Sequence, residues 1–512
     1  MTRRHLQITT EDLTLDDIAA FQDYQPEISI HPEIKNRIDK AQDVMMDLVR
    51  SGKTIYGVNT GFGKFSDVKI SLQQTEELQR RLVLSHAAGV GEPMPVSLVR
   101  LMMLLKIKNL SQGYSGVRYD VVQQLQNLLN QQITPLVPEK GSVGASGDLA
   151  PLAHMTLVLM GEGEVFLNGS RIPGGEALRL KGIKPLRLAA KEGLALLNGT
   201  QAIQAYGLYG LLQARNLLCC ADIIGAMSLE ALLGTLTAFD PRIQEIRRHP
   251  GQMQVAENII RMLAESPIVA SHRDSPHKVQ DAYSLRCIPQ VHGAIRDGVR
   301  HVQDVFGREM NGVTDNPLIF PDQAEVLSGG NFHGEPVALS ADYLGILVAE
   351  LASISERRIE HMMDPAVSEL NAFLAREGGL NSGFMMAHVT AAALVSENKV
   401  LAHPASVDSI PTSANKEDHV SMGTHAARKA LDIIINAEQV LAIELLCACQ
   451  ALEMRQPLKP ADTTERVLQL VRASIPHWDH DRLMHVDLVK AREYIRSGQI
   501  VRVVEEIIGK MN

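Results

Sequence analysis

Residues 200–233 read TQAIQAYGLYGLLQARNLLCCADIIGAMSLEALL, an Ala- and Leu-rich stretch that contains no proline. A helix of about 30 residues would be ~45 Å long, which is far longer than the average helix of a globular protein. Residues 344–351 and 425–455 also place apolar side chains at helical spacing. Because long helices usually bury their apolar faces against one another, we predict a mainly α fold. We expect an elongated bundle of long helices over residues 115–512 and a smaller mixed domain over residues 1–114.

Two short β-hairpins are predicted in addition to the helices. Glu164–Leu167 and Arg171-Ile172 flank Asn168-Gly169, a pair that favours a tight turn between two strands. Residues 319–320 and 326–327 are expected to form a second hairpin of the same kind.

Composition and charge restrict the class of protein. The 512 residues are 45% hydrophobic and 21% charged, as in ordinary globular proteins. The net charge of -9 argues against nucleic acid as a partner, because phosphate binding needs clustered positive charge. No apolar segment follows the basic N-terminus, so no secretory signal is predicted. No stretch approaches the roughly 18 apolar residues of a membrane span, so no membrane partner is expected. The five cysteines form no Cys-x-x-Cys pair, which favours a reducing cytoplasm over a disulfide framework.

Residues 141–153, GSVGASGDLAPLA, carry the most specific chemistry of the chain. A glycine-rich turn runs into a predicted helix that starts near Asp148–Pro151, where proline is well tolerated. The stretch is not a nucleophile elbow, because Asp148 stands two residues after Ser146, where that motif needs glycine. Residues 57–65 fail as a phosphate loop, because they lack the hydroxyl residue that binds magnesium.

Two interpretations of this turn remain open from its residues alone. It is either a tight loop with a capping aspartate or a site of internal cyclisation. In the second case the amide nitrogen of Gly147 attacks the carbonyl carbon of Ala145, and glycine can reach the strained geometry that this needs. Loss of water from Ser146 would then leave an electron-poor methylidene carbon. The N-terminus of a helix would strengthen such an electrophile.

The stretch resembles the signature of the aromatic amino acid ammonia-lyase family, whose members form methylidene-imidazolone from Ala-Ser-Gly. Further motifs of the family follow in order along nearly the whole chain. They are YGVNTGFG at 56–63, LLNGT at 196–200, VQDAYSLR at 279–286, TDNP at 314–317 and GNFHG at 330–334. The resemblance implies a carbon–nitrogen lyase whose electrophile, 4-methylidene-imidazol-5-one, forms autocatalytically from Ala145-Ser146-Gly147 without an external cofactor. It also implies a helical homotetramer with active sites assembled from several chains.

The resemblance assigns roles to residues outside the electrophile. Tyr56 resembles the catalytic tyrosine of the family and would remove the β-proton of the substrate, provided that the site stabilises its phenolate. Tyr283, with Gln280, would assist proton handling. These roles are carried over from the family motifs, because the same residues alone are typical of packing and ordinary hydrogen bonding.

Three further residues are expected to bind the substrate. Arg286 would anchor the carboxylate, because guanidinium pairs with carboxylate through two parallel hydrogen bonds. Asn198, which the family counts among its catalytic residues, would orient either the amine or the carboxylate. Phe332 would pack beside the methylidene ring.

Two positions indicate which amino acid is eliminated. In family members that act on tyrosine or phenylalanine, the positions of Ser85-His86 resemble His-Leu or Phe-Leu, whereas His86 could exchange a hydrogen bond with an imidazole nitrogen. Glu417 stands where phenylalanine lyases resemble Gln, and a carboxylate contact of ~1.5–3 kcal/mol is enough to select a polar ring. The resemblance therefore implies elimination of ammonia from L-histidine to give trans-urocanate, the first step of histidine degradation. Lys416 and His388 depart from the family pattern, in which Gln is frequent at both positions.

Alternatives remain at this point. An aminomutase, or an ammonia-lyase acting on tyrosine or phenylalanine, would use the same electrophile. A helical scaffold without activity predicts loss of Ser146 or Tyr56, and both are present. A metal hydrolase built on the His and acidic residues of 417–425 matches no ligand spacing, so no metal is predicted.

Overall fold

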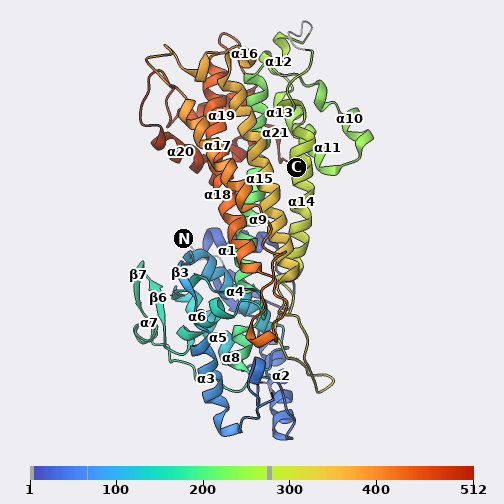
Figure 1. Cartoon of the computed structure of the whole chain (residues 1–512), viewed down its shortest axis with the longest axis vertical. Helices are drawn as coiled ribbons and strands as arrows, with labels where there is room; N and C mark the ends of the chain where they lie inside the picture. Colours follow the sequence, from blue (N-terminus) through green and yellow to red (C-terminus); the bar gives the residue numbers. More distant parts are fainter. Residues whose placement is uncertain (1–4, 66, 274–278, 512) are drawn as a thin grey trace. The chain divides into compact units, whose positions relative to one another are not determined.

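The structure, a computed structural model, describes residues 5–65, 67–273 and 279–511 (Figure 1). Its element order confirms the predicted mainly α fold, with long helices and short strands. The chain divides into two compact units. Unit 1 comprises Met1–Tyr209, Gln303–Asp342 and Pro404–Arg428, and unit 2 comprises Gly210–Val302, Tyr343–His403 and Lys429–Asn512.

Unit 1 holds the shorter helices of the first two hundred residues. They are α1 (Leu15–Tyr24), α2 (Pro32–Arg50), α3 (Thr75–His86), α4 (Val96–Ser111), α5 (Tyr119–Asn130), α6 (Leu149–Leu159), α7 (Gly174–Leu180) and α8 (Glu192–Leu197). Helix α4 is the centre of this unit, because its residues from Leu98 to Ser111 are all buried. It packs against α5, while α3 packs against α6 and α8. The predicted boundary between residues 114 and 115 therefore falls inside unit 1, since these contacts join the two sides of it.

The strands of the described residues form four small sheets, all in unit 1. The parallel pair is β1 (His5–Ile8) with β2 (Glu27–Ile30), and the antiparallel sheets are β3 (Val90–Pro93) with β5 (Pro138–Lys140), β4 (Thr134–Pro135) with β6 (Glu164–Leu167) and β7 (Ser170–Pro173), and β8 (Leu318–Phe320) with β9 (Glu325–Leu327). Both predicted hairpins are confirmed. In the first, Asn168 and Gly169 have positive φ angles of 51° and 79°, as a primed turn requires.

Four long helices lie side by side in unit 2 (Figure 1). They are α9 (Gln201–Ala231), α14 (Ile288–Glu309), α15 (Glu335–Met363) and α18 (Gly423–Glu453), and the first residues of α9, α15 and α18 and the last of α14 belong to unit 1. Helices α9, α15 and α18 confirm the long helices predicted from the sequence. A buried polar network links the four within unit 2. Glu444 pairs with Arg358 and accepts from Ser228 Oγ at 2.7 Å, and Asp222 accepts from His292 Nδ1 at 2.9 Å.

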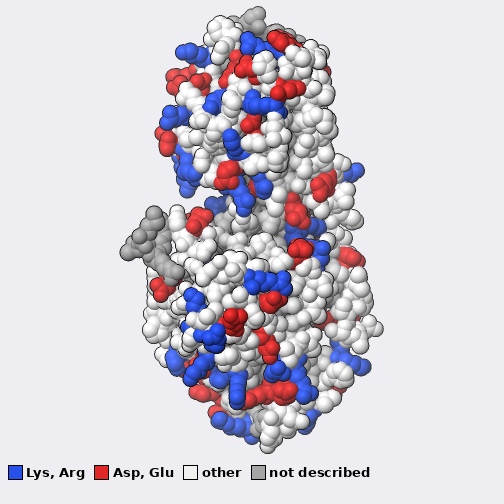
Figure 2. Space-filling view, turned by 90° about the vertical axis from the view of Figure 1, so that its left-hand side faces the viewer, with Lys and Arg blue, Asp and Glu red and all other residues white. Residues whose placement is uncertain are grey.

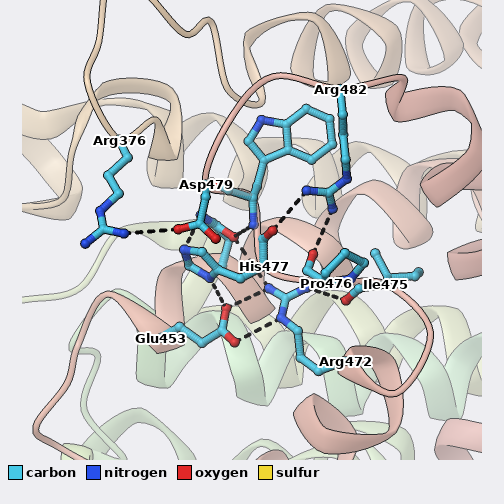
Figure 3. Close-up of polar contacts among 10 residues, drawn as sticks. Arg376, Glu453, Arg472, Ile475, Pro476, His477, Asp479 and Arg482 are labelled. Carbon is cyan, nitrogen blue, oxygen red and sulfur yellow. Dashed lines mark hydrogen bonds and ion pairs between the residues drawn. The ribbon is translucent and has the colours of Figure 1, made fainter.

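The shorter helices of unit 2 surround this bundle. They are α10 (Pro241–Arg247), α11 (Pro250–Leu263), α12 (Pro267–Ser271), α13 (Tyr283–Arg286), α16 (Pro365–Ser368), α17 (Met385–Leu401), α19 (Asp462–Arg472), α20 (Met484–Arg496) and α21 (Gln499–Ile508). Glu453 at the end of α18 ties α19 and the following loop together (Figure 3). Its carboxylate pairs with Arg472 at 2.8 Å and accepts from His477 Nδ1 at 2.5 Å. Although burial opposes ionisation, these hydrogen bonds lower the pKa of Glu453.

Helix α15 corrects one expectation about membranes. By length and composition α15 is apolar enough to cross a membrane. The expectation that no stretch approaches the length and apolar character of a membrane span is therefore wrong for α15. However, 67% of its most apolar window is buried inside the structure, as in the core helix of a soluble protein.

The surface carries both signs of charge. On the face shown in Figure 2, Lys and Arg are interspersed with Asp and Glu. The five cysteines are all free. That nucleic acid is not a partner stays a prediction from the net charge of -9.

Candidate active site

Ala145, Ser146 and Gly147 form a tight turn immediately before α6. The predicted helix start is confirmed, because α6 begins at Leu149. The predicted capping role of Asp148 is wrong, since its side chain makes no cap hydrogen bond to α6. Gly147 has a φ of +77°, and a Cβ atom added there would lie 2.1 Å from the carbonyl oxygen of Gly199. Glycine is therefore needed at position 147, both for the left-handed backbone and for the close approach of the backbone segments at Gly147 and Gly199.

Asp148 fixes this turn to the start of α9. Its buried carboxylate accepts from the backbone amides of Ala202 at 2.8 Å and Ile203 at 2.9 Å, and from the hydroxyl groups of Thr424 and Ser142. Burial raises the pKa of Asp148, and these hydrogen bonds act in the opposite direction by stabilising the carboxylate. The sequence suggested only a helix cap, because the partners of Asp148 lie up to 276 positions away.

A cavity of about 850 Å³ opens beside the turn, within unit 1. Six of the residues predicted for the site line it together: Tyr56, Ser85, His86, Ser146, Asn198 and Glu417. Much of the remaining wall is apolar and comes from Phe62, Leu78, Leu82, Leu149, Leu194 and Leu197. A mostly apolar wall with a few convergent polar groups is typical of a site for a small molecule.

Glu417 contacts Ser146 directly. Its Oε1 accepts from Ser146 Oγ at 2.8 Å. Its Oε2 accepts from Thr412 Oγ1 at 2.6 Å and from Ser413 Oγ at 3.0 Å, so the carboxylate is held from behind by its own loop. If Ser146 lost its hydroxyl group, Oε1 would be free to accept from another donor in the cavity.

His86 presents a second acceptor to the cavity. Its Nδ1 lies 2.8 Å from the carbonyl oxygen of Leu82, and only a protonated nitrogen can donate to a carbonyl. Burial lowers the pKa of His86, although the hydrogen bond to Leu82 and the charge of Glu417 act in the opposite direction. The ring is therefore neutral at pH 7, with Nε2 as an acceptor. Ser85 Oγ supports the ring at 3.1 Å from Nδ1.

Tyr56 and Gly63 are the first and last residues of the YGVNTGFG motif, and they contact each other in the structure. The backbone amide of Gly63 donates to the phenolic oxygen of Tyr56 at 3.2 Å. Phe62 packs edge-on against the ring, with 6.3 Å between the ring centroids. These two contacts fix the ring and the phenolic oxygen of Tyr56 in the wall of the cavity.

Asn198 is held by residues that the sequence did not single out. Its Nδ2 donates to Asp315 Oδ1 at 3.3 Å and to the carbonyl oxygen of Asn316 at 2.8 Å. Lys191 pairs with Asp315 at 2.7 Å, and both side chains are fully buried. Lys106 donates to the carbonyl oxygen of Asn198, and burial lowers the pKa of Lys106 to about 7. Asp315 belongs to the TDNP motif, and that motif was the only feature of the sequence that pointed to a residue holding Asn198.

The remaining predicted residues lie elsewhere. Gln280 and Arg286 line a different cavity, of about 950 Å³, in unit 2. Tyr283 also belongs to unit 2. Tyr283 is 71% exposed, and the Arg286 guanidinium lies 4.6 Å from its ring centre. Phe332 is half-buried in unit 1 and is not among the residues that line the Ser146 cavity.

Both residues that depart from the family pattern lie outside the Ser146 cavity. Lys416 is exposed, and His388 bonds to Glu356 in unit 2 at 2.9 Å. Neither side chain therefore changes the polarity of the cavity wall directly.

A family model for aromatic amino acid lyases matches residues 13–473. The chain belongs to the aromatic amino acid lyase family. It is therefore a carbon–nitrogen lyase. Among the described residues, no group of three or more His, Cys, Asp and Glu side chains could hold a metal ion, so nothing there favours the metal hydrolase.

Relatives within the aromatic amino acid lyase family differ in the reaction that their names state. A histidine ammonia-lyase of Symbiobacterium thermophilum is 52% identical over 499 residues, which cover 98% of both chains. The structure of histidine ammonia-lyase from Trypanosoma cruzi has a TM-score of 0.91 and 44% identity, covering 98% of this chain and 95% of that chain. The structure of tyrosine aminomutase from Streptomyces globisporus has a TM-score of 0.93 and 32% identity, and the match covers 99% of this chain and 100% of that chain. The fold is thus shared by lyases and aminomutases.

Proposed function

We propose that this lyase eliminates ammonia from L-histidine to give trans-urocanate, the first step of histidine degradation. One observation carries the proposal: His86 and Glu417 line the cavity of Ser146, and both offer acceptors. An imidazole ring can donate an N–H to such groups, whereas the phenyl ring of phenylalanine leaves them unpaired at a cost. The names of relatives at about 50% identity agree with this choice.

We also propose that Ala145-Ser146-Gly147 form 4-methylidene-imidazol-5-one. The residues present fit this group, because Gly147 has a left-handed φ of +77°, and a residue without a Cβ atom can reach the strained backbone geometry that cyclisation needs. Once formed, the group would supply an electron-poor carbon as the electrophile for the substrate. Tyr56, supported by the amide of Gly63, removes the β-proton. No external cofactor is part of the proposal.

The direct test identifies the products made from L-histidine by the purified protein. The proposal predicts trans-urocanate and ammonia in equal amounts. A β-amino acid formed without net release of ammonia would instead identify an aminomutase. The aminomutase reaction is the second candidate, because the structure of a tyrosine aminomutase matches this fold with a TM-score of 0.93.

Glu417→Gln tests the choice of substrate. We expect kcat/KM for L-histidine to fall roughly 10- to 100-fold, because a charged acceptor for the imidazole N–H becomes a neutral amide. Turnover of L-phenylalanine should not fall in parallel, since its ring makes no such hydrogen bond. The matched control is Glu377→Gln, at an exposed glutamate of unit 2. An equal loss for both amino acids would contradict a role of Glu417 in selecting the substrate.

We propose a homotetramer in a cytoplasmic location. The free cysteines suit a reducing compartment. Helix α17 buries only Ala387, Ala391 and Asn398, while Met386, Val389 and Val400 are at least half exposed. Apolar residues repeated along one exposed helix are typical of an interface between copies of a chain. Other copies would also bring Gln280, Tyr283 and Arg286 to the cavity of Ser146, as expected for sites assembled from several chains.

Val389→Asp should weaken this assembly, because it places a charge in the proposed apolar interface. Light scattering after size-exclusion chromatography should give four times the chain mass for the wild type and a smaller mass for the variant. Activity should fall with the mass. Leu180→Asp, at an exposed leucine of unit 1, serves as the control. A fully active monomeric wild type would refute the assembled site.

A further inference from the structure

The orientation of the Asn198 side chain is fixed by the groups behind it. Its Nδ2 lies 3.3 Å from Asp315 Oδ1 and 2.8 Å from the carbonyl oxygen of Asn316. Both of these atoms are acceptors. Turning the amide over would set Asn198 Oδ1 against two acceptors, so the NH2 group must face them.

Asp315 is itself hydrogen-bonded at both carboxylate oxygens. Its Oδ2 pairs with Lys191 at 2.7 Å, and its Oδ1 also accepts from the backbone amide of Asn316 at 2.7 Å. The side chains of Asp315 and Lys191 are 0% exposed. The ammonium group of Lys191 on one oxygen and the N–H donors on the other fix the carboxylate in place, so Oδ1 is positioned to hold the NH2 group of Asn198.

The carbonyl end of the Asn198 amide is left for the cavity. Asn198 lines the cavity beside Ser146, and its Oδ1 has no hydrogen-bond partner within the described ranges. Oδ1 is not fully buried, so it reaches the open space of the cavity. The residue therefore offers the cavity an acceptor and keeps its donors for Asp315 and Asn316.

We infer that Asn198 Oδ1 accepts a hydrogen bond from the amine of the substrate, and that Asp315 and Lys191 act as positioning residues that fix this orientation. The amine of an amino acid is a donor, whereas its ionised carboxylate is only an acceptor and would be repelled by Oδ1. The inference rests on the proposed function for the identity of the substrate. It decides between the amine and the carboxylate, which the sequence left open for Asn198.

Binding of two truncated substrates tests the inference. Histamine keeps the amine and lacks the carboxylate, and imidazolepropanoate keeps the carboxylate and lacks the amine. Isothermal titration calorimetry measures the dissociation constant of each with the wild type, Asn198→Ala and Asp315→Asn. We expect Asn198→Ala to weaken the binding of histamine roughly 10- to 100-fold, because a hydrogen bond to a charged group is lost. Asp315→Asn should weaken the binding of histamine in the same direction, because an amide at this position can present its own NH2 group and no longer fixes the orientation of Asn198. Imidazolepropanoate should bind as it does to the wild type.

Other patterns overturn the inference. Greater weakening of imidazolepropanoate would mean that Asn198 serves the carboxylate. Equal weakening of both compounds, or of neither, would mean that Asn198 orients neither group. A merely structural role of Asp315 would not discriminate between the two compounds. Asp322→Asn, an exposed aspartate between β8 and β9, is the matched control and should change neither constant.

A second variant covers loss of folding. Asp315→Asn leaves Lys191 buried without its partner, which is destabilising. The double variant Lys191→Met with Asp315→Asn removes both charges and should weaken histamine selectively as well. Failure of the proposed function is read separately, from the products of the wild type. If the wild type acts on phenylalanine instead, phenethylamine and phenylpropanoate replace the two imidazole compounds.

Discussion

Ser146→Ala should lower kcat for L-histidine on the order of 10³-fold or more, because the variant has no hydroxyl group to lose and so forms no electrophile. The substitution removes one small polar group that contacts Glu417 Oε1, so the fold should persist. Mass spectrometry of the peptide that contains residues 141–153 gives an independent measurement. The wild-type peptide should be lighter than its sequence by two water molecules, and the variant peptide should have the mass of its sequence.

The matched control is Ser170→Ala, at an exposed serine of β7. It should retain the activity of the wild type. An active Ser146→Ala enzyme, or a wild-type peptide without the loss of water, would contradict the proposed electrophile.

Tyr56→Phe should lower kcat roughly 10²- to 10⁴-fold, the usual contribution of a general base. The phenylalanine ring keeps the edge-on contact with Phe62 and loses only the oxygen that accepts from Gly63. Binding of imidazolepropanoate, measured by calorimetry, should therefore change little. Loss of water from residues 141–153 should persist, which separates a missing base from a missing electrophile.

Tyr24→Phe, at a half-exposed tyrosine of α1, is the control for this change. If Tyr56→Phe retained most of the wild-type kcat, the base would have to be another group. Tyr283 would then be the first residue to replace.

The sequence was most informative about local features of the fold. The proline-free apolar stretch at 200–233 predicted the helix that is α9, and the Asn168-Gly169 pair predicted the turn between β6 and β7. Both depend on residues within one segment, where periodicity and turn chemistry act directly. The predicted boundary at residue 114 falls inside unit 1, because contacts such as those of α3 with α6 and α8 are not visible in local composition.

The candidate site was predictable only where a motif covered it. Six predicted residues line one cavity, because each was matched to a family motif and not because spacing revealed the cavity. The supports behind them were missed. Asp315 lies 117 positions from Asn198 and Lys191 lies 124 positions from Asp315, so their contacts form only in the folded chain. Buried charges of this kind have no periodic signature in sequence; the TDNP motif pointed to Asp315, and no motif pointed to Lys191.

The central claim is that the cavity beside Ser146 is built for the imidazole ring of L-histidine. The most direct measurement compares kcat/KM of the wild type for L-histidine, L-tyrosine and L-phenylalanine by the ultraviolet absorbance of each conjugated acrylate. We predict urocanate from L-histidine, with turnover of the other two lower by orders of magnitude. Cinnamate or coumarate as the preferred product would contradict the roles given to His86 and Glu417.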